Sequence, residues 1–191
     1  LVGRSPAQIW RRGVGRTFQI TATFPSMTVA ENVAMVLMSQ ARELFSFTRS
    51  AVNRHRARAL ELLDMVGMAG QADRPCGVLA YGDLKRVELA VALGNDPRLL
   101  LMDEPTAGMA TRARVELMGL AARLTHEMSL AVLFTEHDMD IVFSHADRII
   151  VLSRGELIAE GDAEAIRGNP LVLKTYLGEG QVYRRDGRGG S

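Results

Sequence analysis

The sequence lacks several features that mark particular classes of protein. It has a single cysteine, Cys76, which excludes an internal disulfide and a cysteine-rich zinc site and fits a reducing compartment. Its 23 basic and 22 acidic side chains leave a net charge of +1, so bulk charge gives no indication of a nucleic-acid partner. No apolar run reaches the roughly 18 residues of a membrane span, and residues 1–5 show no secretory signal.

What is present fits one hydrophobic core with alternating strands and helices. The chain has 191 residues, of which 47% are hydrophobic. Strand candidates lie at residues 14–18, 99–102, 130–135 and 148–152, and amphipathic helix patterns lie at 53–66, 84–93 and 112–126. This order predicts an α/β fold with a mostly parallel sheet. Residues 24–76 are mostly helical in pattern, and they open with a predicted capping box formed by Thr28 and Glu31.

The strand candidate at residues 99–102 carries the strongest chemical signal. Four large apolar residues indicate a strand buried on both faces, and Asp103 and Glu104 follow directly at its end. Ligands bind at the carboxyl ends of strands in open α/β sheets. Asp103 is suited to a hydrated Mg²⁺, and Glu104 to polarising a water for attack on a phosphoryl group. The alternative is an ordinary strand end that runs into an Asp-Glu-Pro turn.

Two other stretches have both a structural and a functional interpretation. Leu79-Ala80-Tyr81-Gly82-Asp83 precedes a helix predicted from about Leu84, and a helix start offers free N–H groups to a phosphate, although Asp83 is equally suited to plain capping. His137 follows the next strand along the chain, where an imidazole can contact a γ-phosphate, although such a histidine is commonly structural. The basic residues at 49–58 predict a solvated helix face, because no aromatic residues are interleaved.

Together these stretches resemble the ATP-binding subunits of ABC transporters from about Val14 to Gly178. The resemblance rests on four segments in order: G-R-T-F-Q, L-A-Y-G-D, L-L-L-M-D-E-P-T-A-G and T-E-H-D. The segments F-P-S-M-T-V-A-E-N-V and N-P-L-V-L-K-T-Y-L-G resemble the branched-chain amino-acid importers within that family. The implied fold is a partial P-loop-type (RecA-like) nucleotide-binding domain over residues 1–178. A helical subdomain is expected at about 24–95 and a disordered tail at 179–191.

The resemblance also implies a role for each matching residue. Asp103 and Gln19 would bind Mg²⁺, largely through water, and both would contact the nucleotide. Glu104 and His137 would be catalytic. Leu79, Ala80, Tyr81, Gly82 and Asp83 would form the signature loop, which completes the ATP site of the partner subunit. Ala107, Gly108, Met109 and Ala110 would form the D-loop at the dimer interface.

The sequence departs from the family pattern at two important places. No G-x-x-x-x-G-K-[ST] motif occurs in the 191 residues, although a P-loop supplies the N–H cradle and the lysine for the phosphates. Because the chain begins with Leu1 and the family has its P-loop upstream of Gln19, we expect that the N-terminal part of the domain is missing. Ala80 replaces the serine of the signature loop, which removes a hydroxyl contact worth roughly 1.5–3 kcal/mol.

The resemblance implies ATP and Mg²⁺ as cofactors and transmembrane permease subunits as partners. A homologous ATP-binding subunit and, indirectly, a substrate-binding protein are also expected, with no nucleic acid. The expected location is the cytoplasmic face of the membrane. The expected function is ATP hydrolysis that powers import of branched-chain amino acids or a related amide. The alternative is a docking module that does not hydrolyse ATP.

Overall fold

The computed structural model describes residues 2–17, 23–41, 43 and 49–177. It divides into two compact units, Leu1–His137 and Asp138–Ser191, and each is described by itself. Gln19 and the expected tail at 179–191 lie outside the described residues. The expected division into a helical subdomain and an α/β core therefore remains a prediction.

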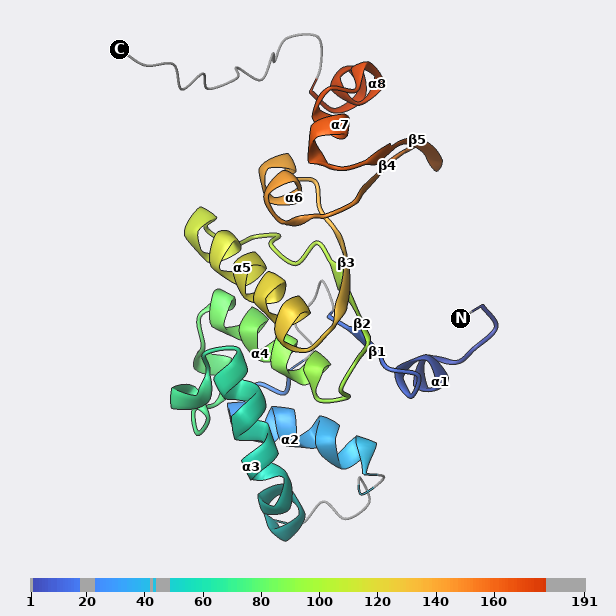
Figure 1. The fold of residues 1–191 in the computed structure, drawn as a ribbon. Helices are drawn as coiled ribbons and strands as arrows, with labels where there is room; N and C mark the ends of the chain where they lie inside the picture. The colour runs from blue at the N-terminus through green and yellow to red at the C-terminus, as the bar shows by residue number, and fades with distance from the viewer. Residues whose placement is uncertain (1, 18–22, 42, 44–48, 178–191) are drawn as a thin grey trace. The chain divides into compact units, whose positions relative to one another are not determined.

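The first unit is built on a parallel sheet, as the sequence predicts. It has three strands in the order β1 (Val14–Arg16), β2 (Leu99–Asp103) and β3 (Ala131–Thr135) (Figure 1). Gly15 pairs with Leu100, and Asp103 pairs with Thr135, so the carboxyl ends of β2 and β3 are level. This register brings the segments that follow the two strands to the same edge of the sheet.

The burial of β2 and β3 differs from the prediction. Leu100 and Met102 on β2 are buried, but Leu99 and Leu101 on the opposite face are only half-buried. The apolar run at 130–135 also predicts a buried strand, and this is wrong. β3 is an edge strand of the described sheet whose residues alternate between half-buried and exposed, and Leu133 is 58% exposed. An apolar run alone does not distinguish one covered face from two.

Helices pack on the sheet and on one another in the first unit. They are α1 (Pro6–Trp10), α2 (Val29–Gln40), α3 (Arg49–Met65), α4 (Tyr81–Leu93) and α5 (Thr111–Glu127). Two short 3-10 turns lie at Ala69–Gln71 and Cys76–Val78. Thr28 and Glu31 form the predicted capping box of α2. The predicted start of α4 at Leu84 is wrong, because the helix begins at Tyr81 with Ala80 as its N-cap.

The core of the first unit joins α2, α3, α4 and α5 to the buried face of β2. The amphipathic pattern of α5 places Leu117, Leu120 and Leu124 in the core, whereas Val115 is 53% exposed. Gly15 on β1 lies against α4: a Cβ there would meet Ala92 O at 2.9 Å. The largest fully buried apolar side chains of this core include Leu62, Leu63, Leu89, Leu93, Leu100, Leu117, Leu120 and Leu124.

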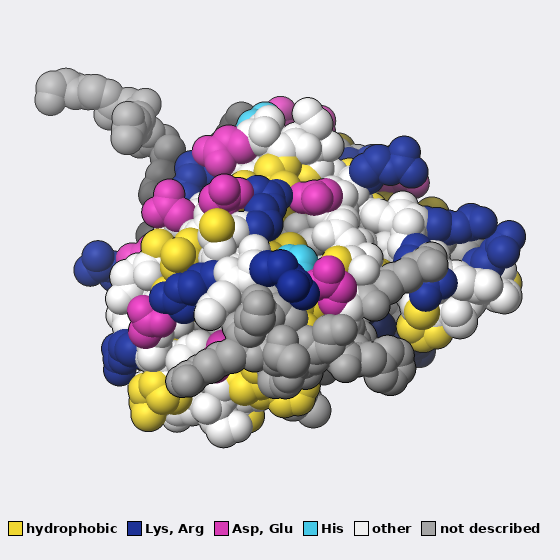
Figure 2. All heavy atoms as spheres, turned by 90° about the horizontal axis from the view of Figure 1, so that it is seen from below, with side chains coloured by type: hydrophobic (Ala, Val, Ile, Leu, Met, Phe, Trp, Pro, Cys, Tyr) yellow, Lys and Arg dark blue, Asp and Glu magenta, His cyan; other side chains and the backbone are white. Residues whose placement is uncertain are grey.

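Arg54, Arg56 and Arg58 of α3 form ion pairs with nearby acids. Arg54 pairs with Glu43 at 3.4 Å, Arg56 with Asp73 at 2.7 Å, and Arg58 with both Glu61 and Asp96. Figure 2 shows basic and acidic side chains interspersed on one face of the molecule. These contacts agree with the interpretation of the basic stretch as a solvated helix face.

The second unit combines a hairpin with short helices. The elements are α6 (Met139–His145), β4 (Ile149–Ser153), β5 (Glu156–Gly161), α7 (Ala163–Arg167), α8 (Pro170–Val172) and a terminal turn at Leu173–Leu177. Asp162 and Asn169 are the N-caps of α7 and α8. β4 pairs antiparallel with β5 in a separate two-stranded sheet, so this strand does not extend the parallel sheet. Among the described helices, none is long and apolar enough to span a bilayer.

Candidate functional site

The carboxyl ends of β2 and β3 are joined through Asp103 and Thr135. The Thr135 hydroxyl donates to Asp103 Oδ1 at 2.7 Å, and Arg16 on β1 lies 3.6 Å from Asp103 Oδ2. The Asp103 side chain is 46% exposed, so it is oriented by protein contacts and also open to solvent. The structure thus places the predicted metal-binding carboxylate at the strand ends.

Glu104 leaves the strand in an unusual backbone conformation. Its φ is 44°, in the left-handed region that residues other than glycine seldom adopt. Its N–H donates to the Thr135 carbonyl at 3.1 Å and contacts the Thr135 hydroxyl at 3.2 Å. These contacts hold a strained backbone, which is typical of functional positions. Glu104 therefore starts the loop after β2 in a fixed geometry.

Thr106, two residues further on, is held by a residue that sequence reasoning missed. Glu136 Oε1 accepts from the Thr106 hydroxyl at 2.6 Å and from the Thr106 N–H at 2.9 Å. Thr106 is 2% exposed, and its carbonyl accepts from the Met109 N–H at 3.1 Å. The only sequence signal was the position of Glu136 directly before His137, and that position gives no partner.

The segments at 79–83 and 107–110 lie against each other. A Cβ at Gly82 would be 3.7 Å from Met109 Cε, and a Cβ at Gly108 would be 3.8 Å from Tyr81 Cε1. Gly108 has a φ of 73°, which a side chain would strain. Sequence reasoning named both segments for separate reasons, and the structure brings them together at the start of α4.

The start of α4 has backbone donors that the helix itself does not use. Tyr81, Gly82 and Asp83 are the first three helical residues, so their N–H groups have no partners within the helix. Ala80 gives no side-chain cap, and Asp83 lies in the first turn rather than at the cap position. Leu79 is half-buried and packs on the core. This geometry suits contact with an anion.

His137 lies near the strand ends of the candidate site. His137 is exposed and follows Glu136 after β3, so it follows the strand that pairs with β2, which carries Asp103. The adjacency of these strands is confirmed, whereas the catalytic role of His137 stays a prediction. Gln19 lies outside the described residues.

The residues at the strand ends fit a magnesium ion that arrives with a nucleotide. No group of three or more His, Cys, Asp or Glu side chains that could hold a metal occurs among the described residues. Mg²⁺ bound with phosphates takes one or two carboxylates and fills its remaining positions with water and phosphate oxygens. Asp103, oriented by Thr135 and half-exposed, supplies one such carboxylate.

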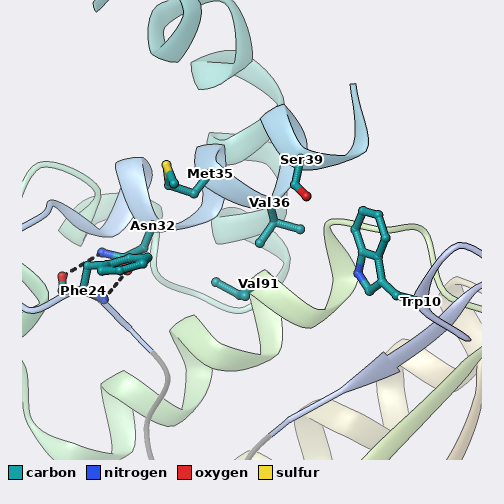
Figure 3. A pocket seen from close by; sticks show the side chains of 7 residues that line it. All are labelled: Trp10, Phe24, Asn32, Met35, Val36, Ser39 and Val91. Atoms are coloured by element: carbon teal, nitrogen blue, oxygen red, sulfur yellow. Dashed lines mark hydrogen bonds between the residues drawn. The ribbon is translucent and has the colours of Figure 1, made fainter. Parts of the chain in front are cut away.

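A separate hollow of about 280 Å³ lies between α1, α2 and α4. Figure 3 shows Trp10, Phe24 and Val91 around it, with Met35, Val36 and Ser39 along α2. Asn32 closes one side: its side chain accepts from the Phe24 N–H at 2.7 Å and donates to the Thr28 carbonyl at 2.9 Å. Asn32 Nδ2 also lies 3.2 Å from Cys76 Sγ, and burial raises the pKa of that thiol.

Comparison with known proteins identifies the family. The profile of the ABC transporter family matches residues 2–107, and that of branched-chain amino acid ATP-binding cassette transporters matches 156–182. The high-affinity branched-chain amino acid transport ATP-binding protein BraF of Pseudomonas aeruginosa is 40% identical over 182 residues, which cover 90% of this chain and 70% of that protein.

Solved structures give the same result. The ADP conformation of an ATP-binding cassette of an ABC transporter matches with a TM-score of 0.76 and 27% identity, over 94% of this chain and 74% of that chain. A dimeric post-hydrolysis state of an ATP-binding cassette bound to ADP and Pi matches with a TM-score of 0.67 and 27% identity, over 84% of this chain and 68% of that chain. The chain belongs to the family of ABC transporter ATP-binding subunits.

Proposed function

We propose that this chain acts in an ATP-binding subunit that powers import of branched-chain amino acids through an ABC transporter. The identity to BraF and the match at 156–182 support the substrate class. One structural observation supports the proposal most directly: Asp103 and Thr135 pair at the carboxyl ends of β2 and β3, and Glu104 and His137 follow these two strands. Family membership implies permease partners and pairing with a second ATP-binding subunit, and the subunit would lie at the cytoplasmic face of the membrane.

The roles proposed for the site residues follow from their chemistry. Asp103 would hold Mg²⁺, which neutralises phosphate charge when bound. Glu104 would polarise the attacking water, and His137 would contact the γ-phosphate. The N–H groups at the start of α4 would contact the ATP held by the partner subunit. The segment 107–110, packed on Tyr81 and Gly82, would lie at the same interface. Gln19 would contact Mg²⁺ and water.

Replacement of the Glu104 carboxylate tests this proposal. We expect Glu104→Gln, assayed with the membrane subunits, to lower ATP turnover by about 10²–10⁴-fold, because the amide cannot accept the proton of the water. Glu127→Gln is the matched control, since Glu127 is an exposed glutamate at the end of α5. Unchanged turnover in Glu104→Gln would contradict the role of Glu104.

A second candidate is a module that completes the nucleotide site of a partner without hydrolysing ATP. One observation favours it: Ala80 offers no hydroxyl at the start of α4. Isothermal titration calorimetry of Mg-ATP binding to the protein distinguishes the two functions. Micromolar binding by the protein alone supports the first function. Binding only in the presence of an ATP-binding partner supports the second.

A further inference from the structure

Glu136 connects the two segments that follow β2 and β3. Its Oε1 accepts two hydrogen bonds from one residue, the hydroxyl and the N–H of Thr106. Hydrogen bonds to a charged acceptor are shorter and stronger than neutral ones, and the 2.6 Å distance between the two oxygens fits this class. Two bonds from one residue fix its orientation as well as its position. Thr106 therefore cannot turn without breaking both.

The other oxygen of Glu136 has a different environment. Oε2 is buried and has no hydrogen-bond partner among the residues that the structure describes. A buried acceptor without a partner costs free energy, so such groups are uncommon in a purely structural setting. An apolar residue of similar size would avoid the unpartnered oxygen but would leave the Thr106 hydroxyl and N–H without the acceptor that Glu136 supplies. The carboxylate therefore indicates a functional constraint at position 136.

The neighbours of Glu136 are the residues of the candidate site. Thr135, on one side, donates to Asp103 and carries the carbonyl that binds the Glu104 N–H. His137 is on the other side. Through Thr106, Glu136 also reaches the turn that ends at Met109, and Met109 contacts the start of α4 beside Gly82. One carboxylate thus stands between the strand-end acids, His137 and the segment 107–110.

We propose that Glu136 is a positioning residue that fixes the loop 104–110 relative to β3 and His137. It acts through Thr106 and contacts neither nucleotide nor water in the reaction. Its effect on turnover rests on the function proposed above, but its effect on the loop does not. When the Glu136–Thr106 contact is lost, the Glu104–Thr135 contacts still hold the start of the loop to β3. Thr106 then lacks the two hydrogen bonds that tie it to the segment after β3, so Glu104 and the segment 107–110 are held less firmly relative to His137.

Hydrogen exchange tests the positional part without any nucleotide. We expect Glu136→Ala to speed exchange of the Thr106 N–H at least tenfold, with a smaller rise at the Glu104 N–H. Glu136→Gln retains an oxygen that can accept both bonds, so exchange stays within about threefold of the wild type. The amide of Leu120 in the core of α5 reports whether the protein remains folded, and Glu127→Gln is the matched control. Unchanged exchange at Thr106 in Glu136→Ala would overturn the proposal.

Kinetics with the membrane subunits test the functional part. We expect Thr106→Val to lower kcat for ATP at least tenfold with KM within about twofold, because the loop is misplaced while nucleotide contacts remain. Thr106→Ser restores the hydroxyl and should return kcat to within about threefold of the wild type. A rise in KM alone, or no rescue by serine, overturns the positioning role. Absence of turnover in the wild type instead contradicts the proposed function, and the exchange result then still decides the loop contact.

Discussion

Lys85 Nζ lies 2.9 Å from Glu88 Oε2, and both side chains are only 6% exposed. The same ammonium lies 5.4 Å from the centre of the Tyr81 ring, so the pair supports the first turn of α4. We expect Lys85→Met to lower the free energy of unfolding by about 3–5 kcal/mol, because it removes the cation from a buried carboxylate. Urea unfolding measures the change.

The double variant Lys85→Met/Glu88→Leu is the control for this prediction. It removes both charges together, so the loss should be smaller than in the single variant. A double variant that is less stable than Lys85→Met would show that the two side chains act independently.

Thr135→Val should weaken the junction between β2 and β3. The substitution keeps the shape of the side chain but removes the hydroxyl that donates to Asp103 and contacts the Glu104 N–H. The expected loss of unfolding free energy is about 1–2 kcal/mol, measured by urea unfolding. Thr135→Ser keeps the hydroxyl and should lose less than half of that amount. A larger loss in Thr135→Ser than in Thr135→Val would mean that the methyl group, rather than the hydroxyl, stabilises the junction.

Asn32 should be among the most sensitive polar positions of the chain. Its side-chain amide accepts from the Phe24 N–H and donates to the carbonyls of Phe24 and Thr28, so Asn32→Leu removes all three contacts from the turn before α2 and places a larger apolar side chain beside these polar groups. We expect a loss of about 2–4 kcal/mol in thermal or urea unfolding. Asn53→Leu, at an exposed position of α3, should stay within about 0.5 kcal/mol of the wild type. A similar loss at both positions would contradict the importance of these contacts.

Two glycine substitutions should have opposite effects. Gly15→Ala places a Cβ 2.9 Å from the Ala92 carbonyl and 3.3 Å from Leu100 and Pro97, so we expect a loss of about 1–3 kcal/mol. Gly119 lies inside α5 with nothing within 4 Å of its Cβ position. Gly119→Ala should therefore gain about 0.5–1 kcal/mol from helix propensity. Calorimetric melting of both variants gives the comparison, and a stable Gly15→Ala would show that β1 and α4 can separate.

Cys76 gives the protein a pH dependence on the alkaline side. Burial raises the pKa of the thiol in the folded state, so only the unfolded chain releases this proton as the pH passes about 8.5. The stabilisation is complete below that pH and is lost as the pH rises toward the folded-state pKa. Urea unfolding between about pH 7.5 and 10 should show a decline that Cys76→Ala reduces. Identical slopes in the two proteins would contradict this assignment.

Much of the candidate site was predictable because its residues act through local patterns. An apolar run followed by Asp103 and Glu104 predicts a strand with acids at its end, and Thr28 with Glu31 predicts a helix start. The pairing of β2 with β3 agrees with the expectation that His137 follows a neighbouring strand. These inferences need only the chain order and the side-chain chemistry.

The parts that sequence reasoning missed depend on contacts between distant residues. Glu136 and Thr106 are 30 positions apart, and nothing in either local pattern indicates the pair. β3 has the same kind of apolar sequence as a buried strand. Its exposure depends on which elements pack against it, and the local sequence does not give that information. The start of α4 at Tyr81 could not be predicted because Tyr81-Gly82-Asp83 has the composition of a loop. The first turn of a helix tolerates such residues, so composition alone does not place the boundary.

The left-handed backbone of Glu104 has a consequence for how this position tolerates substitution. With φ at 44°, glycine would relieve the strain of a side chain there, and Glu104→Gly would be neutral or favourable for folding. The same change removes the carboxylate from the end of β2. At position 104 the residue that suits the backbone conformation differs from the residue that the proposed activity needs. Selection for thermal stability alone would therefore favour variants that lack the Glu104 carboxylate.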